Sequence, residues 1–223
     1  MSVKVNEGIQ LIELHDVIND VEMVFRPTLI WDDQDVVLVD TGYPGHLEDI
    51  RASLEKMPNG KLTKIIITHH DYDHLGGLFE IVQGFDHKIE VYAHELTVPY
   101  IQGKQPLIKT GKIVPKTEVD VTIEDGQVLP FCGGISVIFT PGHTPDHIGL
   151  YHHPTKTLIT GDSMIADQGQ LQRPNPMYTL DMDQALVSLN KFLNFEIETA
   201  VCFHGGVCRG EIKERIAYLA EGK

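Results

Sequence analysis

The sequence predicts an α/β protein, because short apolar runs alternate with segments of helical spacing. The predicted strand at 35–40 is continuously apolar through its middle, as expected for a strand covered on both faces. A glycine- and proline-rich break follows it, and residues 46–57 then repeat apolar side chains at helical spacing. Residues 64–68 form a second β-branched strand, followed by a helical pattern at 75–83. These strand–helix units favour an α/β sheet architecture.

The remaining elements are predicted from the same patterns. Further strands are expected at 10–17, 24–31, 89–93, 119–123, 127–131, 134–139, 147–152, 157–161 and 199–203. Further helices are expected at about 94–101, from an N-cap at Asp181 to residue 194, and at 209–221. Residues 102–118 and 167–179 are rich in loop-forming residues. No low-complexity linker separates the two halves, so we expect one domain, 1–223, made of two similar halves.

Composition excludes several classes of protein. The 223 residues carry a formal net charge of −14, which disfavours binding to nucleic acid or to an anionic membrane. No apolar stretch approaches the roughly 20 residues that span a bilayer. The N-terminal residues lack the apolar core of a signal peptide, so a cytoplasmic location is expected. The chain has three cysteines, an odd number, and no secretion signal. We therefore expect reduced thiols and no disulfide framework.

The densest group of metal-binding side chains is the run Thr68-His69-His70-Asp71-Tyr72-Asp73-His74. Imidazole and carboxylate groups bind divalent metals when deprotonated. The run directly follows the strand at 64–68, and open α/β sheets bind their ligands at the carboxyl ends of strands. The run therefore predicts a metal site, with candidate ligands His69, Asp71, Asp73 and His74.

Three further positions end a predicted strand with a metal-competent side chain beside glycine or proline. They are His143 in Pro141-Gly142-His143, Asp162 in Gly161-Asp162, and His204 in His204-Gly205-Gly206. A single histidine after a strand is more often a structural residue. Four such strand ends in one chain indicate a shared metal site.

In order and residue type, these motifs resemble those of the metallo-β-lactamase-fold superfamily. The superfamily pattern is a strand-end Asp, then His-x-His-x-Asp-His, then a His, an Asp and a final His. In this sequence the pattern falls on Asp40, on residues 69–74, and on His143, Asp162 and His204. The resemblance covers residues 39–206, which is most of the chain.

The resemblance implies a four-layer αβ/βα sandwich, in which two mixed sheets face each other and helices lie outside. It also implies a pair of metal ions at one edge of the sandwich. By position, His69, Asp71 and His143 would hold the first metal. Asp73, His74 and His204 would hold the second, with Asp162 bridging both. Asp40 would support the ligands without binding metal.

Residue 71 departs from the superfamily pattern, because an aspartate stands where a histidine is usual. The alternatives to Asp71 are His70, at a spacer position, if the loop is rebuilt, a water molecule, or a first metal site that is weak or empty. Three carboxylate ligands and one hydroxide contribute about −4, which cancels the charge of two divalent ions. The site should then be a weaker Lewis acid, with its preference shifted from zinc toward iron or manganese. Two divalent metal ions are expected. Zinc is the leading expectation, and iron or manganese are the alternatives.

The resemblance implies a metal-dependent hydrolase, in which a hydroxide held by both metals attacks an ester, lactone or thioester carbonyl. Asp73 is the expected catalytic residue, as proton shuttle to the leaving group. Tyr72, Tyr178 and His147 are candidate oxyanion donors. The expected partner is a small-molecule substrate, with residues 94–117 and 167–179 lining its pocket.

Two other classes of function remain open. One is an iron-dependent oxidoreductase of the same fold, acting on oxygen or on a sulfur substrate, which the carboxylate at Asp71 favours. The other is a non-catalytic metal-binding protein, which would hold about one metal per chain. Bound metal and turnover of a broad ester panel discriminate among the three.

Overall fold

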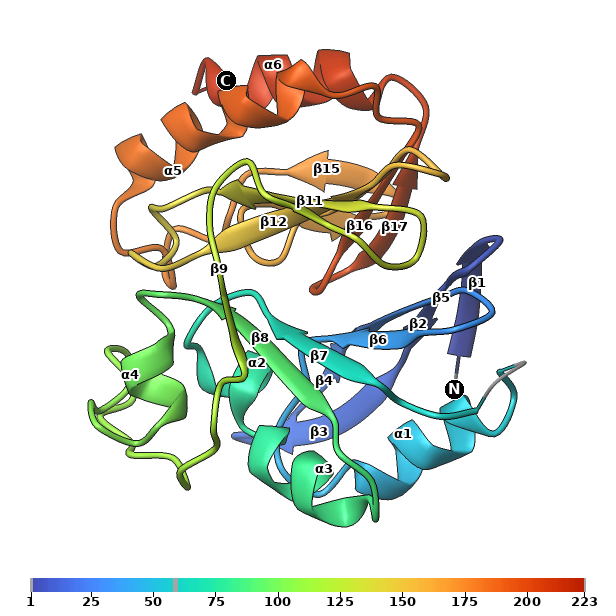
Figure 1. Ribbon diagram of the computed structural model, residues 1–223. Coiled ribbons are helices and arrows are strands. Elements are labelled where there is room, and N and C mark those ends of the chain that lie inside the picture. Colours follow the sequence, from blue (N-terminus) through green and yellow to red (C-terminus); the bar gives the residue numbers. More distant parts are fainter. Residues whose placement is uncertain (1, 58–59, 223) are drawn as a thin grey trace. The chain divides into compact units, whose positions relative to one another are not determined.

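In the computed structural model, which describes residues 2–57 and 60–222, the chain divides into two units, residues 1–123 and 124–223. Each unit has its own β-sheet and its own helices (Figure 1). The alternation of strands and helices along the chain agrees with the predicted α/β class. The single domain predicted for 1–223 stays a prediction.

The first unit is built on a seven-stranded mixed sheet in the order β1-β2-β5-β6-β7-β8-β9. Strands β6, β7, β8 and β9 run parallel to one another, and the remaining neighbours pair antiparallel. A separate hairpin is formed by β3 and β4. The strands are β1 (Ser2–Asn6), β2 (Ile9–Ile12), β3 (Leu14–Ile18), β4 (Val21–Phe25), β5 (Thr28–Trp31), β6 (Val36–Val39), β7 (Lys64–Ile67), β8 (Glu90–His94) and β9 (Val121–Ile123).

The parallel strands form the core of the first unit. Every residue of β6 is buried, as are the three isoleucines of β7, which explains why both segments read as continuous apolar runs. Helices α1 and α3 cover one face of the sheet (Figure 1). The helices of this unit are α1 (Leu47–Leu54), α2 (Tyr72–Leu75), α3 (Leu78–Gly84) and α4 (Val98–Ile101).

The second unit has a six-stranded sheet in the order β10-β11-β12-β13-β16-β17, with β13 and β16 parallel and the other neighbours antiparallel. Helices α5 and α6 lie on one face of it (Figure 1). They bury Leu189, Ile216 and Leu219 in a core with Leu158 and Ala200 of the sheet. The elements are β10 (Val128–Leu129), β11 (Ile135–Phe139), β12 (Ile148–His152), β13 (Thr157–Ile159), β14 (Ile165–Asp167), β15 (Gln170–Gln172), α5 (Met182–Leu189), the 3₁₀ helix η1 (Asn190–Asn194), β16 (Thr199–Cys202), β17 (Gly206–Arg209) and α6 (Ile212–Ala220).

Several predicted boundaries differ from the structure. The strand expected at 10–17 is divided into β2 and β3, and the one at 24–31 into β4 and β5, because the chain leaves the main sheet to form the β3–β4 hairpin. Strands β1, β14 and β17 were not predicted. The expected loop at 167–179 contains β15, which pairs with β14. Asp181 caps α5 as predicted, since its carboxylate accepts a 2.9 Å hydrogen bond from the Gln184 N–H.

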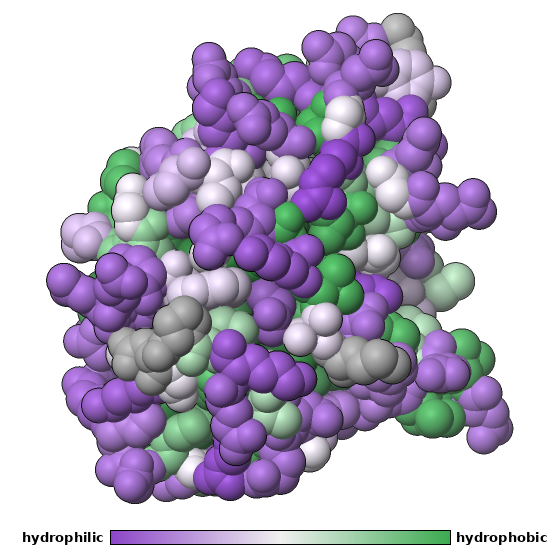
Figure 2. Space-filling model, turned by 90° about the vertical axis from the view of Figure 1, so that its right-hand side faces the viewer, coloured by the Kyte–Doolittle hydropathy of each residue, from purple (hydrophilic) through white to green (hydrophobic). Residues whose placement is uncertain are grey.

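The surface is consistent with the acidic, polar composition. Figure 2 shows one face of the molecule, where hydrophilic residues cover most of the area and hydrophobic residues form small separate groups. Among the helices described at 2–57 and 60–222, none is long and apolar enough to cross a membrane.

Candidate metal centre

In the first unit, two parallel strands bring Asp40 and the histidine-rich run to one edge of the sheet. Val39 of β6 pairs with Ile66 of β7, so the residues after both strands emerge at the same edge. Asp40 has φ = +63°, a left-handed conformation that is costly for a residue with a Cβ. Its side chain is fixed there by hydrogen bonds to the residues that follow β7.

The four candidate ligands of this run form two imidazole–carboxylate pairs. His69 Nε2 lies 3.3 Å from Asp71 Oδ2, and His74 Nε2 lies 3.8 Å from Asp73 Oδ2. The two imidazole rings are 4.0 Å apart between centroids. The short helix α2 begins after Asp71, and its turn carries Asp73 and His74 back toward His69. Local chain geometry therefore gathers all four groups.

Thr68 and Asp40 set the tautomers of both histidines. Asp40 accepts hydrogen bonds from the Thr68 N–H, from the Thr68 hydroxyl and at His74 Nδ1, each at 2.8 Å. The Thr68 hydroxyl has one proton and gives it to Asp40, so His69 Nδ1, 2.9 Å from Thr68 Oγ1, must be the donor to it. By this hydrogen count, both Nδ1 atoms carry protons. In the neutral form of each ring, the lone pair then lies on Nε2, the nitrogen that faces a carboxylate oxygen.

The alternative ligand in this run has another role. The His70 ring stacks on Tyr100 of α4, with centroids 4.1 Å apart and planes 15° from parallel. Asp71, and not His70, is the residue whose polar atom faces His69. Tyr72, a predicted oxyanion candidate, packs edge-on against Tyr43 at 5.4 Å. Burial and the neighbouring Asp73 raise the pKa of Tyr43, which keeps its hydroxyl protonated beside the ligand run.

In the second unit, three strands of the same direction end on the other candidate ligands. Strands β11 and β13 both pair antiparallel with β12, and β16 pairs parallel with β13, so all three run the same way. His143, Asp162 and His204 follow the carboxyl ends of these three strands. The sheet therefore brings together side chains that lie far apart in sequence.

Asp162 is the centre of this group. Its Oδ2 lies 3.5 Å from His143 Nε2 and 3.2 Å from His204 Nε2. The Thr179 hydroxyl donates to the Asn175 carbonyl, so His143 Nδ1, 3.4 Å away, is the donor to Thr179 Oγ1. As in the first unit, Nε2 is the nitrogen that carries the lone pair in the neutral ring, and it faces a carboxylate oxygen.

His147 positions Asp162 through its backbone. The Asp162 N–H donates a 2.9 Å hydrogen bond to His147 Nε2, which leaves the proton on Nδ1 to be donated to Thr140 Oγ1 at 2.8 Å. The His147 ring thus joins the Asp162 backbone to Thr140 after β11, a role different from the predicted oxyanion donor. Tyr178, the third such candidate, is 55% exposed.

Glycines next to two ligands are required by close backbone contacts. Gly205 follows His204 and has φ = +100°, and a Cβ there would lie 1.8 Å from the Ala166 carbonyl oxygen. Gly142 precedes His143 with φ = +135°, and a Cβ there would lie 2.2 Å from the Ala185 nitrogen. The strand ends therefore need glycine to aim the two histidines.

The donor set of each unit suits a divalent metal. In three of the candidate ligands, His69, His74 and His143, Nδ1 is held by a carboxylate or hydroxyl oxygen, as is usual for metal-bound histidine. Each Nε2 faces a carboxylate oxygen at 3.3–3.8 Å, an arrangement of two electron-rich atoms that a cation between them would stabilise. Mixed nitrogen and oxygen donors are ligands of zinc, iron and manganese.

Among the residues that the structure describes, the groups of possible metal ligands include no cysteine. Cys132, Cys202 and Cys208 are buried and form no disulfide, in agreement with the predicted reduced state. Burial raises the pKa of the Cys202 thiol, which keeps this residue, two positions before His204, protonated.

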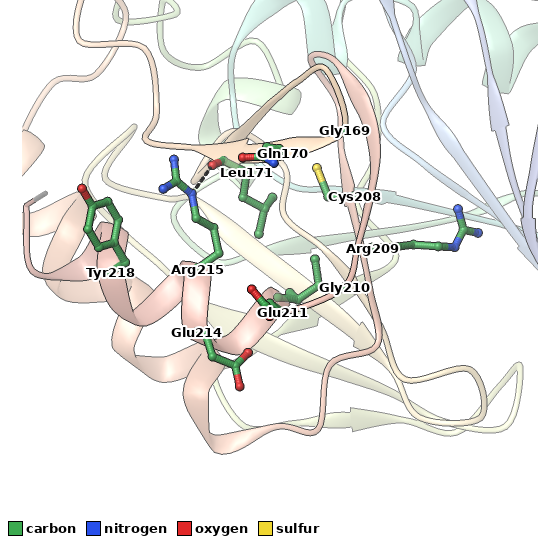
Figure 3. A pocket seen from close by; sticks show the side chains of 11 residues that line it. Gly169, Gln170, Leu171, Cys208, Arg209, Gly210, Glu211, Glu214, Arg215 and Tyr218 are labelled. Atoms are coloured by element: carbon green, nitrogen blue, oxygen red, sulfur yellow. Dashed lines mark hydrogen bonds between the residues drawn. The ribbon is translucent and has the colours of Figure 1, made fainter.

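A pocket of about 300 Å³ lies beside the start of α6 in the second unit (Figure 3). At its edge, Arg215 Nε donates a 2.8 Å hydrogen bond to the Leu171 carbonyl. Its lining includes Gln170, Cys208, Glu214 and Tyr218. The pocket shares no residue with the candidate metal ligands.

An α/β fold whose strand ends carry imidazole–carboxylate pairs defines a class of metal-binding protein. The chain belongs to the metallo-beta-lactamase superfamily, whose sequence profile matches residues 27–204. The resemblance inferred from the motifs is therefore confirmed.

The curated relatives include metallo-hydrolases. The chain is similar to the probable metallo-hydrolase YflN of Bacillus subtilis, with 30% identity over 200 residues that cover 76% of this chain and 75% of the relative. It is 31% identical over 164 residues to the probable metallo-hydrolase YybB of the same organism, covering 71% and 70%. A hydroxyacylglutathione hydrolase of Pseudomonas aeruginosa is 32% identical over 150 residues, covering 64% of this chain and 49% of that protein. The chain thus belongs with metallo-hydrolases.

Solved structures confirm the fold. A metallo-beta-lactamase from Pontibacter korlensis matches with a TM-score of 0.77 at 19% identity, covering 99% of this chain and 97% of that chain. One from Hirschia baltica matches with a TM-score of 0.71 at 21% identity, with the same coverage. The predicted α/β metallo-β-lactamase fold is correct.

Two residues of this region were not predicted from the sequence. Thr68 joins Asp40 to His69, and its place between a strand and the ligand run was the available signal. Lys109 donates a hydrogen bond to Asp71 from 38 positions away, and no sequence pattern links them.

Proposed function

We propose that the protein is a metal-dependent hydrolase with a dinuclear centre, acting on an ester, lactone or thioester carbonyl. One observation carries the proposal. In each of the four histidine–aspartate pairs of the candidate ligands, the imidazole Nε2 lies 3.2–3.8 Å from a carboxylate oxygen. Membership of the superfamily and similarity to probable metallo-hydrolases support the same chemistry.

The ligands are assigned by their place in the superfamily motif. His69, Asp71 and His143 would hold one ion, which we call the first position. Asp73, His74 and His204 would hold the other, the second position. Asp162 would be shared, and its Oδ2 already faces both histidines of the second unit. Zinc is the proposed metal, with iron or manganese as the alternatives that Asp71 favours.

The chemistry divides between the ions and the protein. When bound, a pair of divalent ions supplies an activated water as nucleophile and polarises the carbonyl. Asp73 takes up a proton and delivers it to the leaving group, as a carboxylate beside the reacting atoms can. Asp40 and Thr68 hold His74 and His69 in the tautomer that presents Nε2.

A small molecule with an acyl group is the proposed substrate. The name of one relative, hydroxyacylglutathione hydrolase, describes the release of an acyl group from glutathione. The match covers about half of that relative, so we do not propose the relative's particular substrate for this chain. The shared part of both chains supports acyl hydrolysis as the class of reaction.

Metal analysis together with a substrate panel tests the proposal. We expect about two divalent ions per chain and turnover of at least one lactone, ester or thioester. Chelation should abolish that turnover and added Zn²⁺ should restore it. Turnover that survives complete removal of metal would contradict the proposal.

An iron-dependent oxidoreductase is the second candidate, favoured by the Asp71 carboxylate beside His69. The same preparation separates the two functions. Iron as the main bound metal, with thiol-dependent oxygen consumption and no hydrolysis, would replace the hydrolase proposal.

A further inference from the structure

One carboxylate oxygen of the first position is shared with a lysine. Asp71 Oδ2, which faces His69 Nε2 at 3.3 Å, also accepts a hydrogen bond from Lys109 Nζ. A side-chain cation therefore sits on the oxygen that would otherwise point to the ion held with His69. The two atoms compete for the same lone pairs.

Lys109 is held in place by a closed turn. The Leu107 N–H bonds to the Lys112 carbonyl, and the Gly111 N–H bonds to the Leu107 carbonyl, both at 2.8 Å. Leu107 anchors this turn and is 1% exposed. From the other end of the turn, Lys112 Nζ lies 3.9 Å above the Tyr72 ring. The turn thus fits against two consecutive residues, Asp71 and Tyr72.

The ion pair is largely shielded from water. The side chain of Asp71 is 10% exposed and that of Lys109 is 17% exposed. Charges in such a setting are screened less by solvent and salt than surface pairs. The pair therefore opposes any cation that approaches the Asp71 carboxylate.

The second position has the opposite support. His74 donates from Nδ1 to the Asp40 carboxylate at 2.8 Å, and a carboxylate on the far nitrogen raises the basicity of a ligating histidine. One position has an anion behind its ligand, and the other has a cation on its ligand.

We propose that Lys109 lowers the metal affinity of the first position, so that the two ions bind in order, with the second position filled first. The proposal rests on the proposed dinuclear centre. It assigns to Lys109 control over metal loading, a role that depends on its charge.

The test is a competition titration of metal-free protein with Zn²⁺ against a chromogenic chelator, which gives the number of ions bound and both affinities. Lys109→Met removes the charge at similar length, and Lys109→Arg retains it. Lys112→Met is the matched control, because this lysine lies on the same turn but contacts Tyr72 instead of a ligand. Circular dichroism confirms that each variant is folded.

We expect wild-type protein to bind one Zn²⁺ at least tenfold more tightly than the next. Lys109→Met should tighten the weaker step by about 10- to 100-fold, which is the size of the change, here in the opposite direction, that mutation of a supporting partner of a metal ligand usually causes. Lys109→Arg and Lys112→Met should stay within about threefold of wild type on the same scale. An unchanged or weakened second step in Lys109→Met overturns the role of Lys109 and leaves the hydrolase proposal intact. If wild-type protein binds no Zn²⁺ at all, both proposals fail.

Discussion

The two units assemble their candidate ligands in different ways. In the first unit, His69, Asp71, Asp73 and His74 lie within six consecutive residues, gathered by one strand end and one helical turn. In the second unit, His143, Asp162 and His204 come from three strand ends spread over 62 positions, since they lie between 143 and 204. The first group depends on local geometry, and the second depends on the order of the strands in a sheet.

The difference extends to the residues that support the ligands. The first unit uses one carboxylate, Asp40, which accepts three hydrogen bonds from Thr68 and His74. The second unit uses the His147 ring to hold the Asp162 backbone, and glycine at the turns beside its two histidines. A local cluster needs side-chain support, whereas a dispersed one needs exact turns of the backbone.

The largest expected effect is on the centre of the dispersed group. Asp162→Ala removes the oxygen that faces both His143 and His204, so it should disturb the metals of both positions. We expect at most about one ion per chain and a loss of hydrolysis of about 1,000-fold, equivalent to about 4 kcal/mol. Elemental analysis and steady-state kinetics measure both. Full metal content in this variant would show that Asp162 is not a shared ligand.

Glycine substitution tests the reliance of the second unit on its turns. Gly205→Ala places a Cβ 1.8 Å from the Ala166 carbonyl at φ = +100°, so it should lower the free energy of unfolding by about 2 kcal/mol or more. Gly169→Ala is the matched control, with φ = +79° and open space around the new Cβ, and should cost about 1 kcal/mol. Urea unfolding compares them. Equal losses would mean that the contact with Ala166 is relieved by relaxation.

Replacing the supporting residues compares the two units directly. Asp40→Asn puts an amide donor among three donors, so metal affinity should fall by about 10- to 100-fold. In His147→Gln the amide oxygen can still accept from the Asp162 N–H, so the loss should stay below about tenfold. Zn²⁺ competition titrations give both values. The reverse order would place the more important support in the second unit.

The smallest expected effect is a pH dependence confined to the first unit. His46 joins the β3 hairpin to α1, with Asp16 and Asp49 each 2.9 Å from a ring nitrogen. Burial alone would lower the pKa of His46, but these hydrogen bonds raise it above its usual value. Its stabilisation is therefore complete below about pH 6.5 and is lost as the pH rises through the raised pKa.

The measurement is the melting temperature of wild type and His46→Gln between pH 5.5 and 9. The difference should be a few degrees at the acid end, for about 1 kcal/mol or less, and should shrink as the pH rises. A difference that grows with pH would reverse the sign of this assignment.

Part of the fold was open to prediction because its signals are local. The β-branched runs of β6 and β7 are buried on both faces, and the helical spacing after them forms α1 and α3. Strand β17 was missed because Gly206–Arg209 carries no alternation of its own and forms by pairing with β16. The division of residues 10–17 and 24–31 between a sheet and a hairpin likewise depends on pairing partners.

The sequence by itself determined the superfamily, the candidate ligand run and the strand ends that carry His143, Asp162 and His204, because motif order and residue type survive without coordinates. Only the tertiary structure decided which ring nitrogens face the carboxylates and that Lys109 sits on Asp71. The hydrogen bonds of Asp40 with Thr68 and His74, and of Lys109 with Asp71, join residues 28 to 38 positions apart. No periodicity records such pairs, since they arise when separate strands and turns are packed against each other. Asp71, the residue that departs from the superfamily pattern, is thus paired with Lys109, a partner that only the fold reveals.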